Sequence, residues 1–527
     1  MKPFDALFHN ATILTMHGCC LPEAVAVVEG KVAAVGRRVD LEAGCTAATR
    51  RIDLEGRTLI PGFGDPHAHI WKLGQLLTTT LDQRGAVSIE AMGKQLTDRH
   101  LQLPPASWLE GRGFNELTLA DKRIPTRADL DRYVPDRPVL LTRTCGHVFV
   151  ANSTALQMAG ITRATGAPEG GVIERDEWGE PNGILHETAV GLIRNVLPSP
   201  SSVEYRVMID AALRRQLSFG ITASSDCGVV GGLLETYRAM DADGTLPARM
   251  DVMPLGKPDG AAQIASDLAR HTSPMLTVET VKFLADGGLS GGTAALTTPY
   301  RNSTQSGVTR FSTQELRTLF QEYDRLGWRI CTHAIGDAAI EQVLRLYEEL
   351  PRRTLAAAHR MEHVGLPDRG QLQRMAEAGI LVATQPIFLD ELGANMLRCV
   401  PESLLDRIYP FRSMLDLGLK IAFSSDAPVV RNDAPLKGIE AAVTRRTAEG
   451  EAILANQAIT PSEALFAYTQ GAATVAGAGG TRGSIQPGRW ADFAVLSANP
   501  LTTPIEAISA IRVEQTYLAG TLVYERS

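Results

Sequence analysis

Two histidines near the start of the chain have the type and spacing of metal ligands. His67 and His69 are separated by one residue in the segment PGFGDPHAH. Residues two apart on a strand point to the same face, so both imidazoles can reach one ion. An HxH pair is weak evidence alone, and other residues of the chain strengthen it.

Further candidate ligands lie on predicted strands later in the chain. They are Lys282 in TVKFLADGG, His333 in RICTHA, His363 in HRMEHV and Asp426 in KIAFSSD. A (β/α) barrel collects the carboxyl ends of its strands at one mouth. Imidazole nitrogens with a carboxylate suit Zn²⁺ and similar ions better than Mg²⁺ or Ca²⁺. The set therefore predicts a site for one or two divalent metal ions, with zinc as the expected metal.

Lys282 is the unusual member of this set. An ammonium group among apolar residues beside a metal ion is disfavoured by desolvation and by charge repulsion. Reaction with CO₂ would convert it into an anionic carbamate able to bridge two ions. The alternative is an unmodified Lys282 that pairs with Asp286 or Asp426.

The elements that must position these residues alternate between short apolar strands and amphipathic helices. This pattern predicts βα units and a parallel sheet. The number of candidate strands favours an α/β fold with a TIM (β/α)8 barrel. The predicted strands are 59–65, 221–226, 249–254, 280–285, 329–334, 359–364, 381–386 and 420–426.

The two ends of the chain read as short strands and turns, and neither end could bury its apolar face alone. We therefore expect residues 1–58 and 480–527 to form one small composite β-sandwich domain, with the barrel in 59–479. The interval after the first barrel strand is several times longer than a normal βα connection. Residues 75–200 are predicted to be an insertion domain over the barrel mouth.

Composition excludes several function classes. The chain has 527 residues and a net charge of −7, with no basic footprint for nucleic acid or an anionic membrane. It shows neither a secretory signal nor an apolar run of about 20 residues, so a cytoplasmic protein is expected. The seven cysteines lack CxxC spacing, which indicates neither a disulfide framework nor a thiolate metal site.

Several motifs resemble those of the metal-dependent amidohydrolase superfamily. These are PGFGDPHAH, the strand-borne lysine, the two later histidines and SSDAP. The segments VKFLADGGLSGGTAAL, THAIGDAAI, RMEHV and GSIQPGRWADFAVLSANPL are similar to amidohydrolase family 3, which includes N-substituted formamide deformylases. The resemblance covers nearly the whole chain. It implies a TIM barrel, a composite β-sandwich and hydrolysis at a carbon bonded to nitrogen.

The resemblance also implies roles for the candidate ligands. His67 and His69 would hold the more buried metal together with Asp426, and carbamylated Lys282 would bridge to a second ion. The second ion would be held by His333 and His363, which would also be catalytic through polarisation of the substrate carbonyl. Asp426 would take a proton from the attacking water and return it to the leaving nitrogen. Ser424 stands where relatives often have glycine, which leaves the carboxylate in place.

Other polar residues have two interpretations. His147 and Asn152, in RTCGHVFVANSTAL, either bind the substrate or stabilise a loop by hydrogen bonds. Asp65 either orients a ligand histidine or caps a turn. Three further residues are interpreted as structural: His186, His359 and Glu362.

The predicted function is metal-dependent hydrolysis of a non-peptide amide, such as an N-substituted formamide or N-acyl amine, by metal-activated water. A deaminase or a cyclic-amide hydrolase using the same site is one alternative. A non-catalytic regulatory protein that kept the fold is another. The expected partner is a small-molecule amide, with no nucleic acid and no membrane; whether the chain forms a homodimer is left open.

Overall fold

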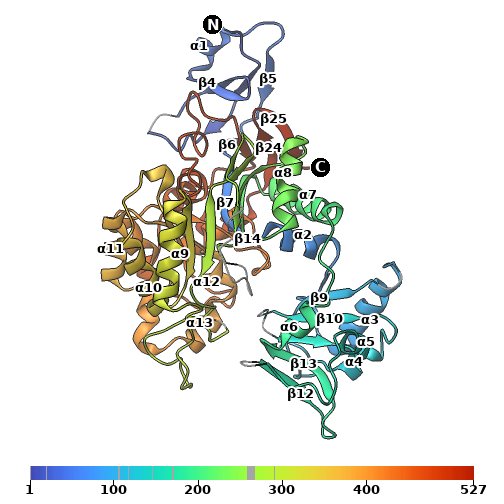
Figure 1. The fold of residues 1–527 in the computed structure, drawn as a ribbon. Helices are drawn as coiled ribbons and strands as arrows, with labels where there is room; N and C mark the ends of the chain where they lie inside the picture. Colours follow the sequence, from blue (N-terminus) through green and yellow to red (C-terminus); the bar gives the residue numbers. More distant parts are fainter. Residues whose placement is uncertain are drawn as a thin grey trace. The chain divides into compact units, whose positions relative to one another are not determined.

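The computed structural model describes residues 2–18, 21–104, 107–116, 118–144, 146, 148–168, 171–257, 268–289 and 291–527. The chain divides into two compact units (Figure 1). Unit 1 comprises Met1–Trp71 and Ile209–Ser527, and unit 2 comprises Lys72–Met208. The segment 75–200 therefore lies within unit 2. Each unit is described by itself.

The strands that carry the candidate ligands form two sheets in unit 1. One has the order β16-β17-β15-β14-β7, and the other has the order β18-β19-β20-β21-β22. Four of these strands, β15, β20, β21 and β22, are buried along their whole length, as expected of parallel strands covered on both faces. Their bounds are β7 Phe63–Ala68, β14 Ile221–Val229, β15 Arg249–Pro254, β16 His271–Thr272, β17 Leu276–Val278, β18 Thr280–Leu284, β19 Arg329–Ala334, β20 Arg360–His363, β21 Leu381–Thr384 and β22 Ile421–Phe423.

The predicted barrel strands are present, but the described residues do not form one closed ladder, which corrects the expectation of a closed (β/α)8 barrel. The chain between 276 and 284 divides its pairing, because β17 pairs with β15 while β18 pairs with β19. A single bridge, Leu255 to Lys282, joins the two sheets there. At the other seam β22 pairs with β21 and not with β7 among the described residues, and the Asp426 amide donates to the His67 carbonyl at 2.8 Å.

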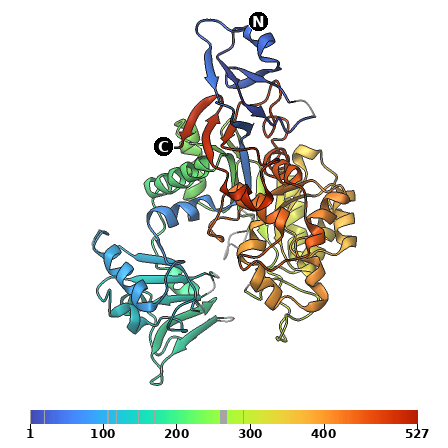
Figure 2. The ribbon, with the colours of Figure 1, turned by 180° about the vertical axis from the view of Figure 1, so that it is seen from behind.

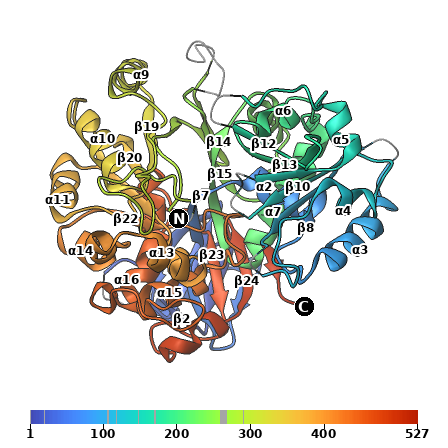
Figure 3. The same cartoon turned by 90° about the horizontal axis from the view of Figure 1, so that it is seen from below.

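Helices of unit 1 follow the strands and cover their outer side, as α9, α10, α11 and α14 do in Figure 3. In α9 the predicted apolar face is buried through Leu316, Leu319, Phe320 and Tyr323. The Ser312 side chain accepts from the Glu315 amide and so caps this helix. The helices are α8 Gly232–Ala242, α9 Thr313–Arg325, α10 Asp337–Glu348, α11 Arg369–Ala378, α12 Ile387–Glu391, α13 Gly393–Cys399, α14 Phe411–Asp416, α15 Pro435–Thr444, α16 Pro461–Phe466 and α17 Ala472–Val475.

The two ends of the chain share one sheet of order β2-β6-β23-β24-β25, visible in Figure 2 as blue and red strands side by side. A second sheet of order β4-β3-β1-β5 packs on it, and Phe8, Phe493 and Tyr517 meet edge to face in their common core. The elements are β1 Ala6–His9, β2 Thr12–Ile13, β3 Ala24–Val28, β4 Lys31–Gly36, α1 Arg38–Glu42, β5 Arg50–Asp53, β6 Thr58–Pro61, β23 Phe493–Leu496, β24 Val513–Leu518 and β25 Thr521–Glu525.

Unit 2 is built on a sheet of its own, with the order β12-β13-β11-β10-β9-β8. Apolar side chains of this sheet and of α3 and α5 form its buried core. The bounds are β8 Leu81–Asp82, α3 Ile89–His100, β9 Leu109–Phe114, α4 Arg127–Asp131, β10 Val139–Arg143, β11 Val148–Ala151, α5 Ser153–Met158, β12 Gly171–Arg175, β13 Pro181–Glu187 and α6 Val190–Arg194; α2 Ile70–Thr78 and α7 Ser202–Ser218 cross the unit boundary. Among all described helices, none is long and apolar enough to cross a membrane.

Candidate metal centre

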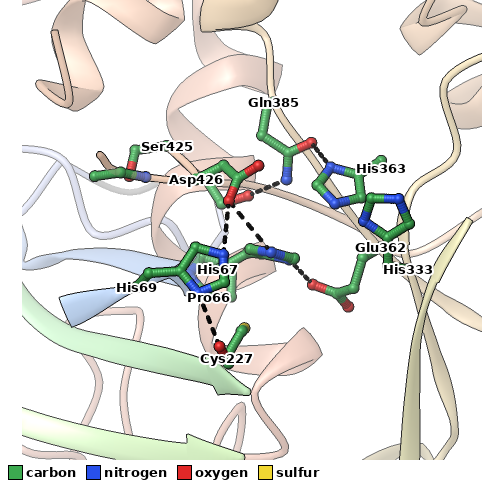
Figure 4. A network of polar contacts seen from close by, with 12 residues as sticks. Pro66, His67, His69, Cys227, His333, Glu362, His363, Gln385, Ser425 and Asp426 are labelled. Atoms are coloured by element: carbon green, nitrogen blue, oxygen red, sulfur yellow. Dashed lines mark hydrogen bonds and ion pairs between the residues drawn. The ribbon is translucent and has the colours of Figure 1, made fainter. Parts of the chain in front are cut away.

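The ligand atoms of His67, His69 and Asp426 converge in unit 1, all within 4.8 Å of one another (Figure 4). His67 belongs to the end of β7, His69 follows that strand, and Asp426 follows β22. Asp426 Oδ1 lies 3.5 Å from His67 Nε2 and 3.3 Å from His69 Nε2. The sequence-predicted ligands from the first and last barrel strands are thus brought together.

The hydrogen bonds of the two rings decide which nitrogens carry lone pairs. His67 Nδ1 contacts the carboxylate of Glu362, and His69 Nδ1 lies 2.8 Å from the carbonyl oxygen of Cys227. Both partners only accept hydrogen bonds when Glu362 is ionised, so each Nδ1 donates. In a neutral ring the Nε2 atom then carries a lone pair. Two lone-pair nitrogens and a carboxylate oxygen therefore face one another.

The electrostatic surroundings favour a neutral His67 and ionised carboxylates. Burial lowers the pKa of His67, and the nearby Lys282 ammonium lowers it further. Burial acts to raise the pKa of Asp426, but the positive charge that His67 and the other imidazoles carry when protonated outweighs it and holds this pKa below its usual range. Burial likewise opposes ionisation of Glu362, yet Arg360 holds the pKa of that carboxyl well below its ordinary value. The cluster is thus rich in acceptors.

His363 and His333 lie against the same cluster. The His363 ring centroid is 4.7 Å from that of His67 and 4.4 Å from that of His333. His363 Nδ1 lies 2.7 Å from Gln385 Oε1, while the Gln385 amide donates to Ser424 at 2.9 Å. Because the Gln385 amide nitrogen donates to Ser424, its oxygen is free to accept, so His363 Nδ1 is the donor and His363 Nε2 carries the lone pair. Burial lowers the pKa of His363 well below its ordinary value.

Asp286 positions the His333 ring. Its carboxylate accepts from the amides of Ala295, Ile335 and Gly336 at 2.9–3.1 Å and lies 3.3 Å from His333 Nε2. A Cβ at Gly336 would lie only 1.9 Å from the Ala295 carbonyl oxygen, so this close approach requires glycine. His333 Nε2 also contacts the Gly287 carbonyl at 3.1 Å. With Nε2 as donor, Nδ1 of His333 is left with the lone pair.

The backbone is strained at two of the candidate ligands. His363 and Asp426 adopt left-handed conformations, with φ of 70° and 57°. Such non-glycine residues cost on the order of 1–3 kcal/mol and cluster at functional sites. Asp65 holds one of these turns, because its buried carboxylate accepts from the Ser425 amide at 3.1 Å and from the His67 amide at 3.4 Å. Asp65 therefore orients backbone rather than a ligand imidazole.

Lys282 is buried on β18, with 2% of its surface exposed. Within the described part of the chain its Nζ atom has no hydrogen-bond partner, and Oδ1 of Asp426 is also without one. Pairing of the ammonium with Asp286 or Asp426 is thus not observed there. An unsatisfied buried amine is costly, which indicates that a further group belongs beside it.

The structure bears on the interpretation of Asn152. Asn152 is fully buried in unit 2, where its side chain caps α5 by accepting from Ala155 and also bonds Val139, Val134 and Arg137. These internal bonds support the loop-stabilising interpretation of Asn152, and the substrate-binding interpretation stays a prediction. His147 lies outside the described residues.

Glu362 is the functional candidate that sequence reasoning missed, since it was interpreted as structural. Its carboxylate reaches His67 across 295 positions of sequence. The signal in the sequence was the i, i+2 spacing of Arg360 and Glu362, which places both on one strand face. A second group of possible ligand atoms, within 4.8 Å of one another, comprises His67, Cys227 and Glu362.

Comparison with known proteins shows that the chain is similar to members of one enzyme family. The model of the amidohydrolase family matches residues 50–524. The YtcJ protein of Bacillus subtilis is 31% identical over 99% of this chain and 100% of its own length. An N-substituted formamide deformylase of Arthrobacter pascens is 30% identical over 99% of both chains.

A solved structure agrees with the sequence comparisons. It is an uncharacterised metal-dependent hydrolase from Pyrococcus horikoshii, 27% identical, with a TM-score of 0.80 over 95% of this chain and 99% of the other. The family match extends over nearly all of both units. The resemblance drawn from the motifs is confirmed, as is the prediction of an enzyme acting on carbon–nitrogen bonds. The chain belongs to the amidohydrolase family and is a hydrolase of that class.

Proposed function

We propose that this protein is a metal-dependent hydrolase that cleaves the carbon–nitrogen bond of a small non-peptide amide. The observation that carries the proposal is the convergence of His67 Nε2, His69 Nε2 and Asp426 Oδ1. Three acceptor atoms this close repel one another unless a cation lies between them. Imidazole and carboxylate donors suit Zn²⁺ or a similar divalent ion.

The remaining residues fit a second ion. His333 and His363 would hold it through the nitrogens that their partners Gly287 and Gln385 leave unprotonated. When bound, divalent ions at such a site lower the pKa of water toward neutrality and polarise a carbonyl oxygen. We therefore propose two metal ions, one at each of these groups of residues.

Lys282 would complete the site as a carbamate. In that reaction the neutral amine nitrogen forms a bond to the carbon of CO₂ and releases one proton, leaving an N-carboxylate with one negative charge. The unsatisfied, buried Nζ supports this proposal, because the carbamate exchanges an unpaired amine for an anionic ligand among imidazoles.

Asp426 would carry the proton during hydrolysis. Its carboxylate takes a proton from the attacking water and then delivers it to the departing nitrogen, which leaves poorly as an anion. The imidazole of His333 or His363 would face the amide oxygen as charge develops on it. The products are a carboxylic acid and an amine.

The substrate class follows from the family and from one relative. The Arthrobacter pascens protein is named for deformylation of N-substituted formamides and matches this chain end to end. We therefore propose an N-substituted formamide or N-acyl amine as substrate. We also propose a domain arrangement. Residues 59–479 form a TIM-type barrel whose eight strands are divided between two sheets, and residues 1–58 and 480–527 form a β-sandwich. A lid role for 75–200 stays a prediction.

Metal analysis and a substrate panel test the proposal. The purified protein should contain at least one divalent ion per chain and lose activity when a chelator removes it, with recovery on addition of Zn²⁺. A panel of N-substituted formamides, N-acyl amines and cyclic amides should yield acid and amine in equal amounts. Ammonia release from a ring amine would favour a deaminase, and folded protein without bound metal or turnover would contradict the proposal.

A further inference from the structure

Glu362 contacts His67, and the hydrolysis proposed above gives it no role. We propose that Glu362, held by Arg360, is a positioning residue that fixes the tautomer and orientation of His67. The inference rests on the proposed function, since it concerns how the chain prepares a metal ligand. Figure 4 shows the Glu362 side chain directed at the His67 ring, on the opposite side from Asp426.

The carboxylate is held on both of its oxygens. Arg360 Nε donates to Oε1 at 2.6 Å, and Arg360 Nη2 donates to Oε2 at 2.8 Å. Both side chains are completely buried. A bidentate pair of this kind has a defined geometry as well as strong hydrogen bonds. Glu362 therefore cannot rotate without breaking a buried ion pair.

The same guanidinium also fixes the strand that carries His67. Arg360 Nη2 donates to the Pro66 carbonyl oxygen at 2.7 Å, one residue before His67 on β7. Arg360 thus holds the acceptor for the ring and the backbone that bears the ring in one arrangement. Pro66 and Arg360 belong to different sheets, and among the described residues no strand ladder pairs β7 with the sheet that contains β20.

The consequence for His67 is a single tautomer. An ionised carboxylate only accepts, so the proton of the neutral ring is on Nδ1 and the lone pair is on Nε2. That lone pair is directed toward Asp426. A carboxylate behind a ligating histidine orients the ring and raises its basicity, and loss of such a partner typically costs about 10–100-fold in metal affinity.

A rival interpretation makes Glu362 a metal ligand with Cys227 and His67, whose candidate atoms lie within 4.8 Å of one another. The contacts favour the positioning role, because both carboxylate oxygens already accept from Arg360 and His67.

The test compares Glu362→Gln with a matched control, Asp492→Asn. Asp492 forms another buried bidentate pair, with Arg249 at 2.7 and 3.0 Å, away from the histidines. In metal-free protein labelled with ¹⁵N-histidine, NMR reads the tautomer of His67, assigned through its loss in His67→Gln. Titration of each variant with Zn²⁺ then gives affinity and stoichiometry.

We expect Glu362→Gln to populate the Nε2–H tautomer of His67, because a glutamine amide can donate to Nδ1. Its affinity for Zn²⁺ should fall about 10–100-fold with unchanged stoichiometry, and excess metal should restore most activity. Asp492→Asn should lose thermal stability only. If both variants lose stability alike while tautomer and affinity stay unchanged, Glu362 is merely structural.

If Glu362→Gln instead loses one ion per chain and excess Zn²⁺ does not restore it, Glu362 is a metal ligand and the proposal is overturned. Because the tautomer is read without metal, it decides the role of Glu362 independently. Absence of any metal binding in the wild type would contradict the proposed function instead.

Discussion

Two buried polar sites, one in each unit, differ in how far the fold satisfies them. In unit 2 every polar atom of the Asn152 side chain has a backbone partner. In unit 1 Lys282 Nζ and Asp426 Oδ1 lack hydrogen-bond partners among the described residues, although both residues are buried. All three residues had been named from the sequence as candidate functional residues.

The difference separates residues that build the fold from residues prepared for a ligand. A buried polar group without a partner costs about 1–3 kcal/mol, so its persistence needs a compensating interaction. Asn152 is compensated within the chain itself. In our proposal a cation and a carbamate compensate the unit 1 cluster. Substitutions should therefore affect activity in one unit and stability in the other.

The largest effect should come from Lys282→Met, which keeps side-chain length and burial but removes the amine. We expect loss of bound metal and with it nearly all turnover, while the protein stays folded. Lys282→Ala should behave alike and regain part of its activity with short carboxylic acids, which mimic the carbamate. Metal analysis and turnover assays measure both losses. A Lys282→Met enzyme with wild-type metal content and turnover would contradict the view that Lys282 is prepared for a ligand.

Asp426→Asn should reduce kcat by about 10²–10⁴-fold, the typical contribution of general acid–base catalysis. Asparagine keeps the shape and an oxygen ligand but cannot carry the proton. Circular dichroism and metal content serve as controls and should change little. Near wild-type turnover of an amide would remove Asp426 from proton transfer.

Asn152→Ala should lower the free energy of unfolding of unit 2 by about 2–4 kcal/mol, because it removes a helix cap and leaves buried backbone groups unpaired. The kcat per folded molecule and the metal content should be unchanged. Chemical denaturation followed by a probe in unit 2 measures the loss. A fall in kcat without a fall in stability would return Asn152 to a substrate-binding role.

The smallest effect should come from Ser424→Ala. This hydroxyl accepts from Gln385, which in turn accepts from His363. Loss of one such bond is worth about 0.5–1.5 kcal/mol, or a few-fold in metal affinity. A Zn²⁺ titration beside the wild type checks it. A loss as large as that of Lys282→Met would mean that the supporting residues matter as much as the ligands.

Much of unit 1 could be predicted from local patterns. Each segment predicted as a barrel strand contains or overlaps an observed one, because apolar runs bounded by turn residues report burial on both faces. The resemblance to the amidohydrolase superfamily implied that His67, His69 and Asp426 meet, and their ligand atoms do converge. Alternation along a strand and the common mouth of parallel strands supplied the physical reason to expect a cluster of ligands there.

The remaining features depend on contacts between distant segments. No local pattern shows that 276–284 divides its hydrogen bonds between two sheets. The partner of each strand depends on how all the strands pack together, and the partners are distant in sequence. The proposed role of Glu362 depends on side chains of β20 reaching β7. The bonds of Asn152 depend on four backbone groups that surround its side chain. The sequence by itself determined which side chains could bind a metal and which strands carry them. Only the tertiary structure decided which buried polar atoms are satisfied, because hydrogen-bond partners are set by packing rather than by spacing along the chain.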